Sequence, residues 1–126
     1  MICDLWQVAV VPFPFPEAPG AKRRPAPVLS HPAFNREGTT VFAMVTSRVH
    51  RPWPGDSVIQ DLEPVGLTRS CIVRLKLFTL DNSLVMRRLG ALSYRDRETV
   101  LSSLGTFFAS SADDTGGVSD LCEARS

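Results

Sequence analysis

The feature that most restricts the fold of this chain is a series of short β-rich runs separated by turns that contain proline or glycine. No helical periodicity lies between these runs, as a parallel α/β sheet would require, so the pattern favours a small all-β barrel. Pro12, Pro14 and Pro16 follow the first run and rule out a central strand there, because proline cannot donate to a sheet ladder. Strands are expected at residues 5–11, 26–30, 41–46, 58–62, 71–77 and 84–92.

One amphipathic helix is predicted after the last run, from about residue 94 to residue 108. Ser93 is a suitable N-cap, because a serine hydroxyl can satisfy a free amide of the first turn, and Asp96 complements the helix dipole. We expect this helix to pack on the barrel through apolar residues that recur at helical spacing. These residues are Val100, Leu101, Leu104, Phe107 and Phe108.

Length and composition indicate one soluble domain. A chain of 126 residues is long enough for one core and too short for two ordinary domains, and its 44% of apolar and 21% of charged residues are typical of globular proteins. No apolar run approaches the ~20 residues that span a bilayer, and the start does not resemble a signal peptide, so a cytoplasmic location without a membrane segment is expected. The domain is placed at residues 1–108, and residues 109–126 are expected to form a polar, flexible tail.

The cysteines and histidines do not form a metal or catalytic signature. Cys3, Cys71 and Cys122 are widely separated and odd in number, which indicates reduced thiols rather than disulfides or a zinc site. His31 and His50 stand far apart without acidic partners nearby in the sequence, and they are interpreted as loop or surface residues. Metal-dependent and triad chemistry are therefore not expected.

Basic residues cluster locally although the formal net charge is only +1. The clusters lie at 22–24, at Arg48 and Arg51, and at Arg87 and Arg88. Each cluster can bind phosphate, but most such clusters, taken alone, are merely the solvated face of a soluble domain. Charge alone does not decide between these interpretations.

Several sequence phrases occur together in a characteristic order: KRRPAPVLS at 22–30, Phe34-Asn35, MVTS at 44–47, VRLKLFTLDN at 73–82 and LGALS at 89–93. In order and spacing they resemble the MazF/PemK family of toxin endoribonucleases, the ribosome-independent RNA cutters of bacterial toxin–antitoxin systems. The resemblance covers roughly residues 3–108. It implies an SH3-like barrel with a C-terminal helix, a homodimer and a cognate antitoxin. It also implies sequence-specific cleavage of single-stranded RNA without a metal or other cofactor.

The resemblance also implies roles for three residues. Arg24 precedes Pro25, whose fixed φ favours a defined direction for the guanidinium, and the matching family arginine is a catalytic acid or transition-state stabiliser. Thr46 matches a threonine that supports the reacting phosphate, although a threonine at a strand end can be purely structural. Glu17 approximately matches a loop glutamate that accepts a proton or orients the 2′-OH, and it can equally be a solvated loop acid. Such chemistry needs no protein nucleophile, because the substrate's 2′-OH attacks the phosphorus and leaves a 2′,3′-cyclic phosphate.

Further residues are expected to contact the substrate. Asp81 matches an aspartate of the family, but it can also cap the turn that it makes with Asn82. The predicted substrate-binding residues are Lys22, Arg23, Ser47, Arg48, Lys76 and Asp81.

The sequence departs from the family pattern at two positions. Phe78 occupies the place of an arginine found in many members, and Cys3 replaces a usual glycine. Phe78 can stack on a base or fill the core, and core packing is the preferred interpretation. The same choice between a base-stacking loop and a hydrophobic lid applies to residues 12–16 and to Trp53.

Two other functions remain compatible with such a barrel. A non-enzymatic gyrase poison resembling the CcdB toxins would carry an aromatic C-terminal end, whereas here no tryptophan follows Trp53. A catalytically silent relative could still bind RNA or an antitoxin, and the substitution at Phe78 leaves this open. Cutting of RNA by the purified protein separates these possibilities.

Overall fold

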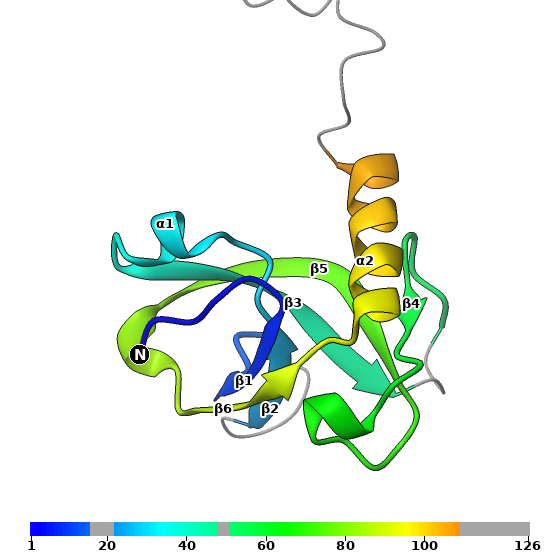
Figure 1. The fold of residues 1–126 in the computed structure, drawn as a ribbon, viewed down its shortest axis with the longest axis horizontal. Helices are drawn as coiled ribbons and strands as arrows, with labels where there is room; N and C mark the ends of the chain where they lie inside the picture. Colours follow the sequence, from blue (N-terminus) through cyan, green and yellow to red (C-terminus); the bar gives the residue numbers. More distant parts are fainter. Residues whose placement is uncertain (16–21, 48–50, 109–126) are drawn as a thin grey trace, which may run out of the picture.

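The computed structural model describes residues 1–15, 22–47 and 51–108. Two small antiparallel sheets are followed by one long helix (Figure 1). One sheet has the strand order β2-β1-β6 and the other the order β3-β5-β4. The strands are β1 (Gln7–Pro12), β2 (Arg23–Pro27), β3 (Thr39–Ser47), β4 (Ser57–Val58), β5 (Cys71–Asp81) and β6 (Arg87–Ala91). The helices are α1 (Pro32–Asn35) and α2 (Tyr94–Phe107), with the 3₁₀ turns η1 (Glu63–Val65) and η2 (Asn82–Leu84).

The two sheets enclose the core from different sides. A bridge between Val28 and Phe42 joins the chain after β2 to β3 and thereby links the sheets. One buried cluster includes Val45, Val73 and Val100, and a second is built around Phe42. The prediction of a mainly β fold with a C-terminal helix is confirmed.

Helix α2 begins as the sequence predicts. The Ser93 hydroxyl accepts a hydrogen bond from the amide of Asp96 at 3.4 Å, and the buried Asp96 carboxylate accepts bonds from the amides of Gln60 and Asp61. Asp96 therefore fastens the start of α2 to the chain after β4, besides complementing the helix dipole. The predicted apolar face is only partly covered by the barrel. Of its residues, Val100 and Leu104 pack on the core. The exposed members of this face are Leu101, Phe107 and Phe108.

Strand β2 starts earlier than predicted. The expected strand at residues 26–30 is observed at Arg23–Pro27, paired to β1. Pro25 and Pro27 do not prevent this pairing, because β2 lies at the edge of its sheet among the described residues and its outer side needs no amide donor. The shift brings Arg23 and Arg24 into the strand.

Three other predicted strands differ from the observed ones by three residues or more at one end, whereas β1 and β3 differ by at most two. The strand expected at 58–62 is only Ser57–Val58, because the chain turns into η1 at Pro64. The strand expected at 84–92 starts at Arg87, because Asp81 caps η2 and bends the chain first. Strand β5 continues beyond residue 77 to Asp81, and the short helix α1 was not predicted.

No helix in the described ranges combines the length and the apolar character that crossing a membrane requires.

Candidate active site

The candidate site lies on the face of the β3–β5 sheet that is turned away from the first core cluster. Side chains alternate between the faces of a strand, and Ala43 and Val45 of β3 belong to that cluster. Met44 and Thr46 consequently point to the other side. Arg74 of β5 is paired with Met44, so its side chain shares this face.

A pocket of about 310 Å³ opens on this face. Thr46, although almost fully buried as a residue, contributes to the wall. The chain before β4 closes the opposite side with Trp53. The lining residues are Met44, Thr46, Arg51, Pro52, Trp53, Arg74 and Lys76.

Arg74 organises the segment that closes this pocket. Its Nε and Nη2 donate to Oδ1 and Oδ2 of Asp56 at 3.1 and 2.9 Å, and Nη2 also donates to the carbonyl of Arg51 at 2.7 Å. The Asp56 carboxylate in turn accepts a bond from the Trp53 amide, and the Arg74 guanidinium lies 5.6 Å from the centre of the Trp53 ring. Because the Arg74 side chain is only 9% exposed, this is a desolvated, two-pronged ion pair, the strong form of such an interaction.

An aromatic bridge runs from this pocket towards Arg24. Phe13 and Phe15 follow β1, and their ring centres are 5.2 Å apart. Phe15 meets Phe78 edge-on at 5.6 Å, and Phe78 stacks on the buried Phe42. Phe78 is half-buried and packs against the second cluster, which agrees with the preferred interpretation, and Phe15 contacts this cluster through Phe78.

Phe13 and Phe15 each lie against a cationic side chain. The Arg24 guanidinium lies 4.7 Å from the centre of the Phe13 ring, and Lys76 Nζ lies 4.2 Å from that of Phe15. Arg24 Nε is buried, and the described residues offer it no hydrogen-bond acceptor. Lys76 also lines the Thr46 pocket, so the bridge connects Arg24 with that pocket.

Arg24 itself lines a second, more open hollow of about 580 Å³. Arg23 and Arg87 lie along it, with Met86 and Leu67 as apolar walls. The structure thus places Arg24 and Thr46 in neighbouring hollows rather than in one cavity, joined through Phe13, Phe15 and Lys76.

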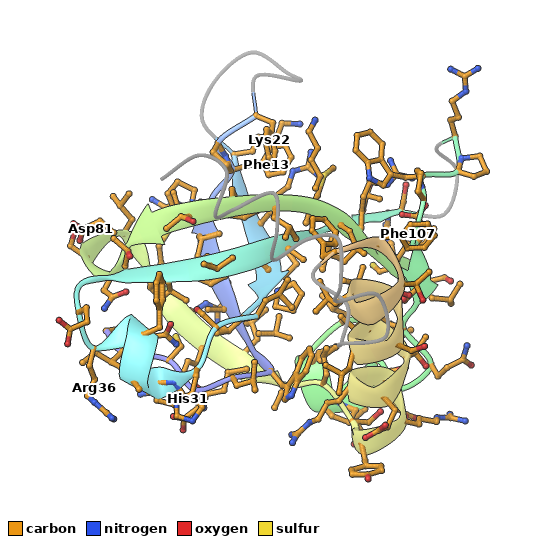
Figure 2. All side chains as sticks on the ribbon, turned by 90° about the horizontal axis from the view of Figure 1, so that it is seen from above. Phe13, Lys22, His31, Arg36, Asp81 and Phe107 are labelled. Carbon is orange, nitrogen blue, oxygen red and sulfur yellow. The ribbon has the colours of Figure 1, made fainter. Side chains whose placement is uncertain are left out.

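The remaining basic and hydroxyl residues of the predicted site lie at its margins. Lys22 is exposed, and its carbonyl accepts a bond from the Phe13 amide at 2.7 Å, which fixes it beside the aromatic bridge (Figure 2). Ser47 is exposed at the end of β3, next to Thr46. Glu17, Arg48 and His50 lie outside the described residues.

Asp81 and His31 are not brought to this site. Figure 2 shows Asp81 at a different end of the molecule from Phe13 and Lys22, and His31 on the opposite side. Asp81 caps η2, as the turn-capping alternative predicted, and its hydrogen bonds from Ser83 lower the pKa of its carboxyl group. His31 caps α1 by accepting a bond from the Ala33 amide.

The described cysteines are free thiols, as predicted. Cys3 is buried in the second cluster and Cys71 is half-buried, and burial raises the pKa of both. Cys122 and the rest of the tail at 109–126 lie outside the described residues. Within the described part, no three residues of the metal-ligating types gather into a group that could hold an ion.

Sequence reasoning missed the ion pair of Asp56 and Arg74. The alternation in VRLKLF places Arg74 and Lys76 on one face of a strand, which is a signal for a polar face. The partner could not be found in this way, because Asp56 lies in a loop at a distance of 18 residues.

A family model described as the PemK-like, MazF-like toxin of type II toxin–antitoxin systems matches residues 4–108. The chain belongs to this family. No match is found among curated proteins. The family assignment therefore rests on the model, which spans both sheets and α2, and it confirms the resemblance seen in the sequence.

Solved structures show the same fold. A MazE–MazF structure from Deinococcus radiodurans is 25% identical, with a TM-score of 0.67, and the match covers 88% of this chain and 100% of that chain. The Mycobacterium tuberculosis toxin MazF-mt6 is 16% identical, with a TM-score of 0.65 and coverages of 84% and 99%. A mycobacterial endoribonuclease in complex with its cognate antitoxin is 20% identical, with a TM-score of 0.64 and coverages of 82% and 92%. The predicted SH3-like barrel of the MazF type is thereby confirmed.

Proposed function

We propose that this toxin is a metal-independent, sequence-specific endoribonuclease that cuts single-stranded RNA. Family membership supports the class, since a similar structure is named an endoribonuclease. The observation that carries the proposal is the continuous surface from Arg24 across Phe13 and Phe15 to the Thr46 pocket. Cations and aromatic rings in alternation suit an unpaired strand, because cations bind phosphates while rings stack on bases.

The proposed reaction uses the substrate's own 2′-OH as the nucleophile. The 2′ oxygen forms a bond to the adjacent phosphorus, the bond to the 5′ oxygen breaks, and the product carries a 2′,3′-cyclic phosphate. One group must accept the 2′ proton and another must stabilise the phosphorane and protonate the leaving oxygen. We assign the second role to Arg24 and a hydrogen bond to the phosphate to Thr46. Glu17 is the proposed acceptor of the 2′ proton.

Residues around these groups are proposed to hold the strand. Lys22, Arg23, Arg48 and Lys76 would bind phosphates, and the Ser47 hydroxyl would contact the strand beside Thr46. The position of Asp81 does not add support to its predicted role in binding substrate.

The proposed partners are a second copy of this chain and a cognate antitoxin, and the proposed location is the cytoplasm, where RNA and antitoxin meet. One similar structure contains a cognate antitoxin and another is a MazE–MazF complex, which supports an antitoxin for this toxin. The exposed apolar residues of α2 support a partner surface.

The proposal is tested by incubating purified protein with a long defined RNA in EDTA and mapping the ends by primer extension. Arg24→Ala should lower the rate about a hundredfold to a thousandfold, the typical loss for one preorganised donor. Arg24→Lys should recover little, because lysine lacks the planar two-pronged geometry that matches phosphate oxygens. Thr46→Val deletes only the hydroxyl and should lower turnover without changing the circular dichroism spectrum.

His31→Ala is the matched control, because His31 lies on the opposite side of the molecule. If both Arg24→Ala and Thr46→Val cut at the parental rate, while EDTA or His31→Ala abolished cutting, the proposed active site would be wrong. Binding of RNA without cutting would identify a silent relative. Intact RNA together with inhibited gyrase would identify a topoisomerase poison.

A further inference from the structure

We propose that the Thr46 pocket binds one unpaired base of the RNA, stacked on the Trp53 indole, and that Asp56 and Arg74 are positioning residues for that indole. This inference rests on the proposed function, because it assigns a substrate group to the same site. It adds a base-binding residue and the device that holds it in place.

The volume of the pocket suits a small ligand such as one base. A volume of about 310 Å³ is at the lower end of the range of small-molecule pockets, about 300–1,000 Å³. Thr46 lines the wall where the proposed chemistry occurs, so a base held here would belong to a nucleotide close to the cleaved bond.

The chemistry of the walls favours a nucleotide over a purely apolar ligand. Trp53 is 42% exposed, and Met44 is a second apolar lining residue, while Arg51 and Lys76 are cations of the same lining. A flat apolar surface beside positive charges recognises a base and its phosphate together. The carboxylate of Asp56, the acid nearest to Trp53 in the sequence, is already bound to Arg74, so it does not repel a phosphate as an isolated acid would.

The main chain of the turn that carries the indole is held by a connected set of hydrogen bonds. The Asp56 carboxylate accepts a hydrogen bond from the Trp53 amide at 3.0 Å, and the Asp56 amide donates one to the Trp53 carbonyl at 3.1 Å. These two bonds close the turn. Arg74 of β5 donates hydrogen bonds to the Asp56 carboxylate and to the Arg51 carbonyl, and thereby links this turn to the strand. Gly55 completes the turn with a φ of 82°, and a Cβ there would lie 2.7 Å from Leu75 Cδ1.

This arrangement explains why a strong ion pair occurs in a loop beside the pocket. A base binds more tightly to a ring whose orientation is already fixed, because otherwise binding must also order the ring. The cation of Arg74 near the indole adds to this fixation. The ion pair therefore contributes to RNA binding through the preorganisation of Trp53.

The test uses short single strands of 2′-O-methyl RNA, which lack the free 2′-OH and cannot be cut. A strand of equal length and charge without bases is the matched probe. The chain has two tryptophans, so Trp6→Phe leaves Trp53 as the only indole. Fluorescence of Trp53 should be quenched by the strand that carries bases and much less by the abasic strand. Anisotropy of a labelled strand measures the same affinities with Trp6 in place, should Trp6→Phe fail to fold.

Trp53→Ala should weaken binding of the base-carrying strand about fivefold to 150-fold, the effect of losing one stacked base. It should leave binding of the abasic strand unchanged, and Trp53→Phe should recover part of the loss. Phe34→Ala is the control, because Phe34 is similarly exposed at 48% but lies in α1 between His31 and Arg36 (Figure 2).

Asp56→Asn should weaken binding of the base-carrying strand in the presence of Trp53 and have little effect in the Trp53→Ala background. Such non-additivity distinguishes a positioning residue from one that only stabilises the fold. Equal losses in both backgrounds would refute the positioning role.

Equal affinity of the Trp53→Ala variant and the parent for the base-carrying strand would overturn the proposal and leave the indole as a surface for a protein partner. Because the probes are not cut, failure of this inference is separable from failure of the proposed function. RNA cutting with no effect of Trp53→Ala refutes only the base pocket, whereas Trp53-dependent binding without cutting refutes only the enzyme.

Discussion

Replacement of Gly90 by alanine should destabilise this fold, although the backbone there does not require glycine. A Cβ at Gly90 would lie 1.9 Å from the Pro64 carbonyl oxygen and 3.4 Å from Val65 Cα. Contacts below 3.0 Å are essentially never made by real Cβ atoms, so β6 and η1 must separate by more than an ångström. The obstacle is backbone rather than a flexible side chain, so relaxation cannot be confined to one rotamer.

Overpacking of this kind typically costs about 1–3 kcal/mol, and the backbone contact places Gly90→Ala towards the upper part of that range. For a domain of this size, the loss corresponds to a decrease in Tm of roughly 3–15 °C. Thermal and urea unfolding followed by circular dichroism measure the change. The matched substitution is Gly105→Ala in α2, where a Cβ would meet nothing within 4 Å.

Gly105→Ala should be neutral or stabilising by about 0.5–1 kcal/mol, because alanine has less conformational freedom to lose in a helix. The two variants thus make the same chemical change with opposite expected signs. Equal shifts of Tm for both variants, or an unchanged Tm for Gly90→Ala, would refute the argument from space.

Three further predictions concern charge and assembly. Hydrogen bonds from Arg95 lower the pKa of Asp61 from 3.8 to about 2. The stability that these bonds contribute is therefore present above pH 3.8 and is lost as the pH falls through about 2. Arg95→Ala should flatten this part of a profile of unfolding free energy against pH. The protein should sediment as a homodimer at micromolar concentration, because Leu101 and Phe107 of α2 remain exposed, and a monomer would contradict this. A saturating antitoxin should compete with RNA for the surface at 22–24, and undiminished cleavage in its presence would refute that placement.

The sequence predicted the fold class because its periodicities are local properties. Short β-rich runs and the late change to helical spacing sufficed for a barrel with a terminal helix, and Ser93 marked the start of that helix correctly. Strand ends depended on tertiary context instead. Pro25 is acceptable only because β2 is an edge strand, and Asp81 ends β5 by capping η2.

The candidate site was predictable only where one phrase contained the signal. Arg24 and Thr46 were predicted from their sequence phrases, and the structure places them in neighbouring hollows joined by Phe13, Phe15 and Lys76. The pairing of Asp56 with Arg74 joins a loop to a strand, and no local pattern indicates such a contact. The phrase LGALS contains Gly90, but the reason for a glycine there is the carbonyl of Pro64, which only the fold brings near.

Arg24 and Arg74 lie in different electrostatic surroundings, which the net charge of the chain does not reveal. Prolines alternate with Phe13 and Phe15 in an extended segment, and alternation places both rings on one side. Arg24 rests on this aromatic surface, and an aromatic face attracts a guanidinium without cancelling its charge. Arg74, by contrast, is paired with the carboxylate of Asp56. Arg24 therefore has a buried Nε without a hydrogen-bond partner among the described residues, which suits the proposed contact with a phosphate, whereas Arg74 binds Asp56 and the Arg51 carbonyl beside Trp53.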